Sequence, residues 1–129
     1  MLNKYSLIFS RETRNFFRLA LLENKNRIGL VKFSTPPEPL TKNAYLHSIE
    51  IAEELRNKNI GSRLLNKMEL YLTTNTEVEN ILGMLWNDNT NPYLEEFFIK
   101  NDYLLKYDER SIYDNGEDII ECVPMLKKI

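Results

Sequence analysis

The sequence predicts an α/β (α+β) protein in which helices pack on a mixed, mostly antiparallel sheet. Three observations carry this prediction. Short β-rich runs occur in pairs near both ends of the 129-residue chain. An amphipathic helical pattern follows a strand-like alternation in the middle, and a continuous apolar run comes directly after it. That strand–helix–strand order is typical of a parallel connection. We expect residues 1–129 to fold as a single domain.

The first third of the chain favours three strands. Residues 5–10 are a short β-rich run, and residues 15–23 and 27–34 are apolar runs around a polar break that contains asparagine. Such a break between two apolar runs favours a hairpin. A helix over Phe16–Leu22 is the alternative, because the leucines and alanine there suit either state.

Residues 35–43 hold three of the five prolines and predict a loop. Residues 45–51 then alternate as in a strand, so their side chains form two sets. One set is Tyr45, His47, Ile49 and Ile51, and the other is Leu46, Ser48 and Glu50. A bulge in this strand would reverse the assignment beyond it.

The second half of the chain continues with a helix, a strand and another helix. From Ser62 onward, apolar residues recur with the i, i+1, i+4, i+7, i+8 spacing of a helix packed on a sheet. Residues 80–86 are a short apolar run that predicts a buried strand. Asn91 and Pro92 suit the N-cap and first position of a second helix. Residues 102–107 and 119–125 are the last two strand candidates, with Asn115–Gly116 as a turn signal between them.

The composition excludes several classes of protein. The net charge of −2 argues against an electrostatically driven nucleic-acid binder. No run is apolar and long enough for a membrane span, and the first residues do not resemble a signal peptide. Cys122 is the only cysteine, so no internal disulfide forms and a reducing compartment fits best. We expect a cytoplasmic protein without a membrane partner, and a homodimer is compatible with the sequence.

The loop over residues 56–62 is the strongest candidate for a binding site. It contains two cations, Arg56 and Lys58, then an asparagine, a glycine and a serine directly before the helical pattern. Backbone N–H groups at the start of a helix have no partner within the helix, and the helix dipole favours negative charge there. This loop therefore predicts a site for an anionic ligand.

The loop resembles motif A of the GNAT superfamily, the acyl-CoA-dependent N-acetyltransferases. That motif reads Arg/Gln-x-x-Gly-x-Gly/Ala between a strand and a helix. Arg56 takes its first position, Asn59 its first glycine and Gly61 its last. Asparagine is the residue other than glycine that most readily adopts a positive φ, so Asn59 can replace that glycine.

Two further matches follow in the family's order. Asn91, Phe98, Lys100 and Tyr103 have the spacing of motif B, with Phe98 in place of the usual tyrosine. Tyr113 and the residues 115–118 resemble the tail of the ribosomal-protein N-terminal acetyltransferases. The matches cover residues 44–125, about two thirds of the chain. The family's helical segment after the first strand is reduced or absent, because only residues 11–15 separate the first two strand candidates.

The resemblance implies that the chain binds acetyl-CoA and transfers its acetyl group to a primary amine of a small molecule, peptide or protein. No metal takes part in such a transfer. The residues that the resemblance assigns to the cofactor are Ile49, Glu50, Ile51, Arg56, Asn57, Lys58, Asn59, Ile60, Gly61, Ser62, Asn91 and Phe98.

His47 is the only histidine and Glu50 is its neighbour on the same strand, so each is a candidate general base. The alternative for both is a strand residue without a chemical role. The family's tyrosine protonates the departing thiolate, and here Tyr93, Tyr103 and Tyr113 are the candidates to replace it. With Phe98 at the tyrosine position, a non-catalytic module that binds acyl-CoA is the alternative function.

Overall fold

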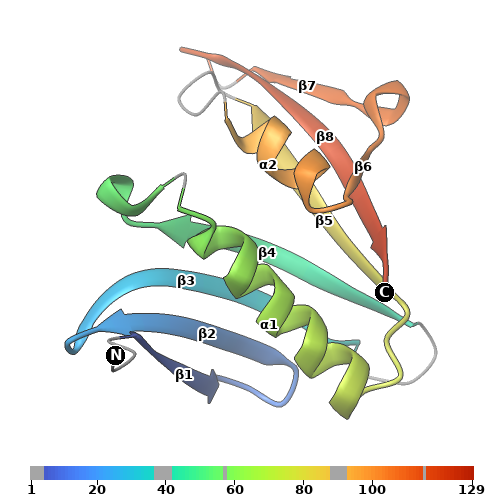
Figure 1. The fold of residues 1–129 in the computed structure, drawn as a ribbon. Helices are drawn as coiled ribbons and strands as arrows, with labels where there is room; N and C mark the ends of the chain where they lie inside the picture. Colours follow the sequence, from blue (N-terminus) through green and yellow to red (C-terminus); the bar gives the residue numbers. More distant parts are fainter. Residues whose placement is uncertain (1–4, 37–41, 57, 88–92, 115) are drawn as a thin grey trace.

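The computed structural model describes residues 5–36, 42–56, 58–87, 93–114 and 116–129, and it has the predicted mixed α/β architecture (Figure 1). The strands form one sheet in the order β1-β2-β3-β4-β5-β8-β6, with β7 also paired to β8. Neighbouring strands are antiparallel except β4 and β5. In chain order the elements are β1 (Tyr5–Arg11), β2 (Phe16–Glu23), β3 (Asn26–Ser34), β4 (Asn43–Ile51), η1 (Glu53–Leu55), α1 (Ile60–Asn75), β5 (Asn80–Asn87), α2 (Leu94–Lys100), β6 (Leu104–Leu105), η2 (Tyr107–Glu109), β7 (Ser111–Asp114) and β8 (Ile119–Lys128).

The N-terminal part is a three-stranded antiparallel meander. β2 and β3 are joined by a two-residue turn in which Asn24 and Lys25 have φ angles of 50° and 72°. This confirms the hairpin, and the helix over Phe16–Leu22 was the wrong alternative. β1 pairs directly with β2, and only residues 12–15 connect them. The reduced N-terminal helical segment is therefore confirmed.

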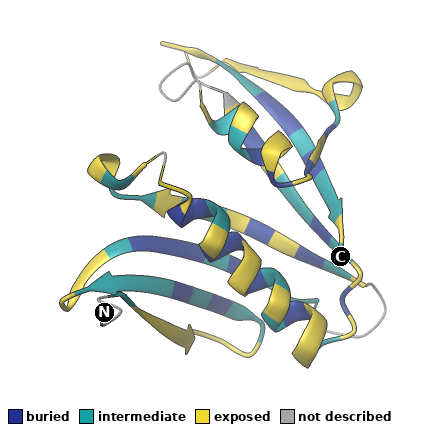
Figure 2. Ribbon diagram, viewed as in Figure 1, coloured by how far each residue is buried: buried dark blue, intermediate teal, exposed yellow. Residues whose placement is uncertain are grey.

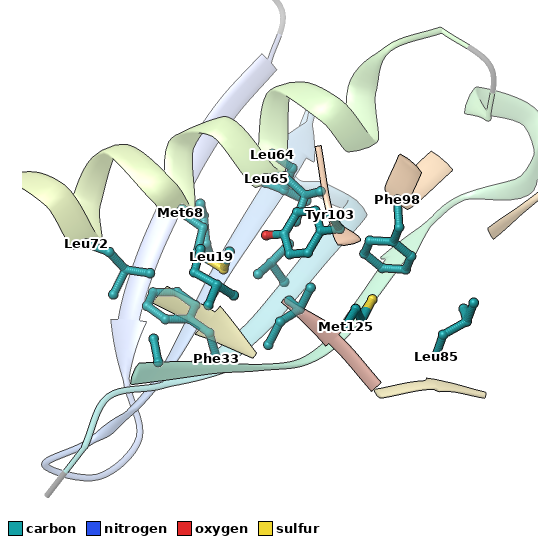
Figure 3. Close-up of a cluster of buried hydrophobic side chains, with 14 of the residues drawn as sticks. Leu19, Phe33, Leu64, Leu65, Met68, Leu72, Leu85, Phe98, Tyr103 and Met125 are labelled. Carbon is teal, nitrogen blue, oxygen red and sulfur yellow. The ribbon is translucent and has the colours of Figure 1, made fainter. Parts of the chain in front are cut away.

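The core lies between the sheet and one face of α1 (Figure 3). The apolar stripe predicted from residue 62 onward supplies Leu64, Leu65, Met68 and Leu72, all of which are fully buried. They pack against inward-facing side chains of β2 and β3 such as Phe33. The burial of each of these side chains contributes about 1.5–3 kcal/mol to the stability of the fold. The stripe therefore holds α1 on the sheet.

The opposite face of the sheet carries neither α-helix. Leu46 and Leu85 point to the helix side and are buried, whereas the alternate residues Tyr45, Met84 and Trp86 are exposed. Figure 2 shows the same contrast along the strands, with buried and exposed positions alternating. We call this surface the open face of the sheet. Residues 12–15, which link β1 to β2, are too few to form a helix on this face.

The structure differs from the sequence prediction at three places in the C-terminal half. α2 begins at Leu94 with Tyr93 at the N-cap position, later than predicted; Asn91 and Pro92 lie outside the described residues. The strand predicted over residues 102–107 shrinks to β6, because a 3-10 turn follows at Tyr107. β7 forms inside the predicted connection instead, and pairs with β8 through a turn in which Gly116 has φ +91°.

Across the described part of the chain, no group of three or more His, Cys, Asp and Glu side chains could hold a metal ion. None of the described helices has the length and apolar character needed to cross a membrane.

Candidate functional site

The centre of the sheet opens between its two parallel strands. β4 and β5 pair only from Asn43↔Asn80 to Leu46↔Gly83 and then diverge, as Figure 1 shows. Beyond this point β4 continues to Ile51 with β3 alone, and β5 continues to Asn87 with β8 alone. On the side that faces β5, the stretch from His47 to Ile51 therefore presents an edge that pairs with none of the described strands. Such an edge can accept an extended ligand as an additional strand.

A β-bulge lies where the two strands separate. Phe33 pairs with Leu46 but the preceding Lys32 pairs with Ser48, so His47 is the extra residue in β4. The bulge reverses the alternation, as the alternative interpretation of this strand allowed. Ile49 and Ile51 consequently turn to the helix side and pack against the core, while Glu50 is exposed. His47 and Ile49 thus do not belong to one continuous face.

The first backbone donors of α1 have no acceptors within the helix. The first intrahelical bond runs from Arg63 N to Asn59 O at 3.0 Å. Asn59 has φ 60°, as its tolerance of positive φ predicted, and it forms no side-chain cap. The N–H groups of Ile60, Gly61 and Ser62 are therefore free of helical partners. No acidic residue occupies the first turn of α1 to compete for them.

α2 closes the other side of this loop through two hydrogen bonds. Lys100 Nζ donates to Asn59 Oδ1 at 2.8 Å, which explains why Asn59 does not cap its own helix. Asn101 is buried and its Nδ2 donates to Ser62 Oγ at 3.0 Å. These two bonds hold the end of α2 over the start of α1.

Gly61 lies where the ring of Phe97 on α2 comes close to the start of α1. A Cβ atom placed on Gly61 would lie 2.8 Å from Cε1 of Phe97. Any side chain at this position would therefore displace the Phe97 ring, which lines the same cavity. The last glycine of the loop thus serves close packing of α2 on α1 as well as access to the backbone.

Together these elements enclose a cavity of about 560 Å³, within the range of small-molecule sites. The lining residues are Ile49, Glu50, Ile51, Glu53, Leu55, Arg56, Asn59, Ile60, Gly61, Ser62, Tyr93, Leu94, Glu96, Phe97 and Lys100. The structure thus brings together most of the residues assigned to the cofactor from the sequence. Asn57 and Asn91 lie outside the described residues.

Two residues assigned to the cofactor lie elsewhere. Phe98 is buried in the core against Tyr103, at 5.4 Å between ring centroids, because it points from α2 toward the sheet. Its neighbour Phe97 lines the cavity in its place. Lys58 is exposed and does not line the cavity. Arg56 does line it, although its Nε donates to Ile51 O at 3.1 Å.

The wall formed by α2 was missed in the sequence. It consists of Tyr93, Leu94, Glu96, Phe97 and Lys100. These residues recur every three to four positions and so lie on one helical face. A helical projection of the predicted second helix could therefore have found this wall. The sequence alone did not show that this face of α2 lies opposite the loop before α1.

His47 lies outside the cavity, on the open face of the sheet. Its Nε2 is 2.7 Å from Ser34 Oγ, and its ring lies 5.1 Å from the ring of Phe16. His47 is exposed, but partial desolvation of its ring disfavours the charged imidazolium and lowers the pKa of His47 below its ordinary value of 6.5. The imidazole is therefore neutral at pH 7 and able to accept a proton.

The three candidate tyrosines have different surroundings. Tyr93 lines the cavity, and Tyr113 lies on β7 with its ring against Trp86. Tyr103 is buried, and its hydroxyl donates to Glu69 at 3.4 Å. Burial and the Glu69 carboxylate raise the pKa of Tyr103 far above its ordinary value, so this hydroxyl holds its proton. Tyr93 is the one of the three with a place in the cavity wall.

Comparisons with known proteins identify the family and the fold. The model of the acetyltransferase (GNAT) family matches residues 3–103, which is most of the chain. None of the curated protein sequences matches.

Solved structures match over most of the chain at low sequence identity. A GNAT acetyltransferase from Streptococcus pneumoniae matches with a TM-score of 0.75 and 16% identity over 92% of this chain and 70% of its own. A Bacillus anthracis protein described as a streptothricin acetyltransferase was solved with acetyl coenzyme A. It matches with a TM-score of 0.71 and 14% identity over 92% of this chain and 65% of its own. The ribosomal-protein-S18-alanine N-acetyltransferase of Escherichia coli matches with a TM-score of 0.70 and 12% identity over 92% of this chain and 72% of its own. At these identities the likeness shows the fold.

Proposed function

The chain belongs to the GNAT family of acetyltransferases, and from this premise we propose that it transfers an acetyl group from acetyl-CoA to a primary amine. The amine belongs to a small molecule, a peptide or a protein. The observation that carries the proposal is that the unpaired edge of β4 and the uncapped start of α1 line one cavity. The first can pair with the amide groups of the pantetheine arm, and the second can bind the diphosphate.

The chemistry requires no covalent intermediate on the protein. The amine nitrogen attacks the thioester carbonyl carbon, the carbon–sulfur bond breaks, and the amine loses a proton as the thiolate gains one. His47 lies on the bulge where β4 leaves β5, and Glu50 lines the cavity three residues further on. Either can take the proton from the amine, and Tyr93 is the hydroxyl on the cavity wall that can protonate the thiolate. Positioning the two reactants contributes much of the rate in such transfers.

The function is tested by the release of CoA thiol from acetyl-CoA over time, with a panel of amines and peptides. We expect release that depends on both the protein and an amine. A non-catalytic acyl-CoA-binding module is the second candidate, favoured by the burial of Phe98 at the position of the family's tyrosine. That candidate predicts acetyl-CoA binding without thiol release for any acceptor. If the chain neither binds acetyl-CoA nor releases thiol, both candidates are wrong.

Removing the charge of Lys100 is expected to weaken acetyl-CoA binding. Its ammonium lies 2.8 Å from Asn59 in the loop that would hold the phosphates, so it can supply charge to them. We expect Lys100→Gln to raise Kd about 10-fold, as for the loss of one charge-assisted hydrogen bond. Titration calorimetry measures Kd, and Lys128→Gln is the control because it removes an equal charge from an exposed residue of β8. Equal values for the two variants would contradict this role of Lys100.

If His47 is the general base, the rate of acetyl transfer depends on pH in a definite direction. Its pKa is lowered below 6.5, so the neutral, base-competent imidazole predominates at pH 7 and is lost only as the pH falls below 6.5. We expect kcat/KM to be constant near pH 7 and to decline at more acidic pH. His47→Gln should lower kcat about 100-fold and remove that decline. A Gln variant with full activity would leave Glu50 as the base.

A further inference from the structure

The ring of His47 is held by residues from two neighbouring strands. Ser34 on β3 places its Oγ 2.7 Å from Nε2, and Phe16 on β2 lies against the ring. The strand register explains this meeting: Phe16 pairs with Ser34, and Ser34 pairs with Tyr45 of β4. The bulge then adds His47 as the extra residue of β4 close to this row. The backbone therefore brings these three side chains together on the open face.

The short contact to Ser34 engages Nε2, and the position of the hydrogen in this contact determines what Nδ1 can do. Nε2 is occupied by Ser34, so Nδ1 is the nitrogen left for chemistry. In a neutral imidazole one nitrogen carries hydrogen and the other accepts, and the partner of one nitrogen selects the state of the other. If Nε2 donates to Ser34 Oγ, the lone pair of Nδ1 is available. If Ser34 donates instead, Nδ1 carries the hydrogen and cannot act as a base.

We propose that Ser34 is the positioning residue of His47: its Oγ accepts the Nε2–H hydrogen bond, fixes that tautomer and leaves Nδ1 to take the proton of the acceptor amine. The catalytic part of this proposal rests on the proposed acetyl transfer, whereas the tautomer is a property of the folded chain itself. The lowered pKa of His47 favours the neutral ring, which is the state in which a tautomer is defined, and the 2.7 Å contact with Ser34 is the feature that fixes it in this proposal.

Among the described residues, Ser34 is the polar partner of the His47 ring. The charged and titratable groups on this face of the neighbouring strands lie at other positions. Lys32 and Arg18 occupy the next outward-facing positions of β3 and β2, and Arg18 Nη1 is 2.8 Å from Glu12 Oε1. On β4 itself, Tyr45 and Glu50 are exposed. Partial desolvation is the cause of the lowered pKa of His47, rather than these charges.

The test uses the fact that His47 is the only histidine of the chain. A long-range ¹H–¹⁵N correlation spectrum therefore shows one imidazole, and the two nitrogen shifts report its tautomer directly. At a pH above 7 we expect a hydrogen-bearing Nε2 and an accepting Nδ1 in the wild type and in Ser34→Thr, which keeps the hydroxyl. In Ser34→Ala we expect the shifts to move toward an average of the two tautomers. Ser10→Ala, which changes an exposed serine of β1, is the matched control.

Kinetics then separate this proposal from the proposed function. With an amine that is acetylated, Ser34→Ala should lower kcat about 10-fold, part of what a general base contributes, while KM for acetyl-CoA stays unchanged and Ser34→Thr restores the rate. An accepting Nε2 in the wild type would overturn the proposal, as would an unchanged spectrum in Ser34→Ala. Loss of the tautomer without loss of rate would refute its catalytic part. If the tautomer is as expected but no amine is acetylated, the proposed function fails while the assignment of Ser34 stands.

Discussion

Replacing Ser62 with aspartate is expected to abolish acetyl-CoA binding while the chain remains folded. Ser62 lines the cavity in the first turn of α1, where the uncapped N–H groups would hold the diphosphate. A carboxylate about 4 Å from a phosphate costs about 4 kcal/mol near a protein surface. We therefore expect Kd to rise at least about 100-fold, measured by titration calorimetry.

The same substitution should not unfold the protein. Ser62 Oγ accepts a hydrogen bond from Asn101, and an aspartate oxygen can accept it as well. A negative charge in the first turn of a helix is itself stabilising. Ser62→Asn is the matched control, because it has the shape of aspartate without the charge. Similar affinities for Ser62→Asp and Ser62→Asn would contradict an anion site at the start of α1.

Removing the carboxylate of Glu69 is expected to destabilise the fold more than removing any exposed acid. Glu69 on α1 lies 2.7 Å from Lys127 Nζ on β8, and the two side chains are only 13% and 16% exposed. The hydroxyl of Tyr103 donates to the same carboxylate, and Lys127 lies over the Tyr103 ring. Glu69→Ala would leave the largely buried Lys127 ammonium without its carboxylate partner. We expect a loss of about 3 kcal/mol in the free energy of unfolding.

A second ion pair of the chain provides the control for this effect. Glu79 lies 3.2 Å from Lys42, but the side chains are 62% and 54% exposed. Such exposed pairs contribute less than about 1 kcal/mol, so Glu79→Ala should unfold at nearly the wild-type urea concentration. Equal losses in the two variants would show that the Glu69–Lys127 pair does not join α1 to β8 as we infer. The comparison matters for function because this pair connects the two halves of the sheet that diverge at the site.

The elements of the fold could be predicted where local signals were strong. The apolar stripe of α1 and the asparagine-containing turn between β2 and β3 both specify their structure within a few residues of sequence. The bulge at His47 could be proposed as an alternative but not placed, because it depends on how β4 pairs with β3. β7 was missed for a similar reason. Its pairing with β8 is decided by the turn around Gly116 rather than by its own short, exposed sequence.

The candidate site could be predicted on one side only. The loop before α1 is continuous in sequence, so the order of a cation, an asparagine, a glycine and a serine indicated an anion site. The opposite wall comes from α2, and the contacts of Lys100 with Asn59 and of Phe97 with Gly61 join residues about 40 positions apart. Such contacts follow from tertiary packing, which no local pattern encodes. The packing of α2 also determines that Phe97, and not the predicted Phe98, lines the cavity. Consecutive side chains on a helix point about 100° apart.

The proposed acetyl-CoA site is tested most directly by a structure of the wild-type chain with acetyl-CoA. We expect the diphosphate within hydrogen-bond distance of the backbone nitrogens of Gly61 and Ser62. We also expect the pantetheine arm beside Ile49–Ile51 in the opening between β4 and β5. Acetyl-CoA bound elsewhere on the molecule, with the N–H groups at the start of α1 unengaged, would contradict the proposed site.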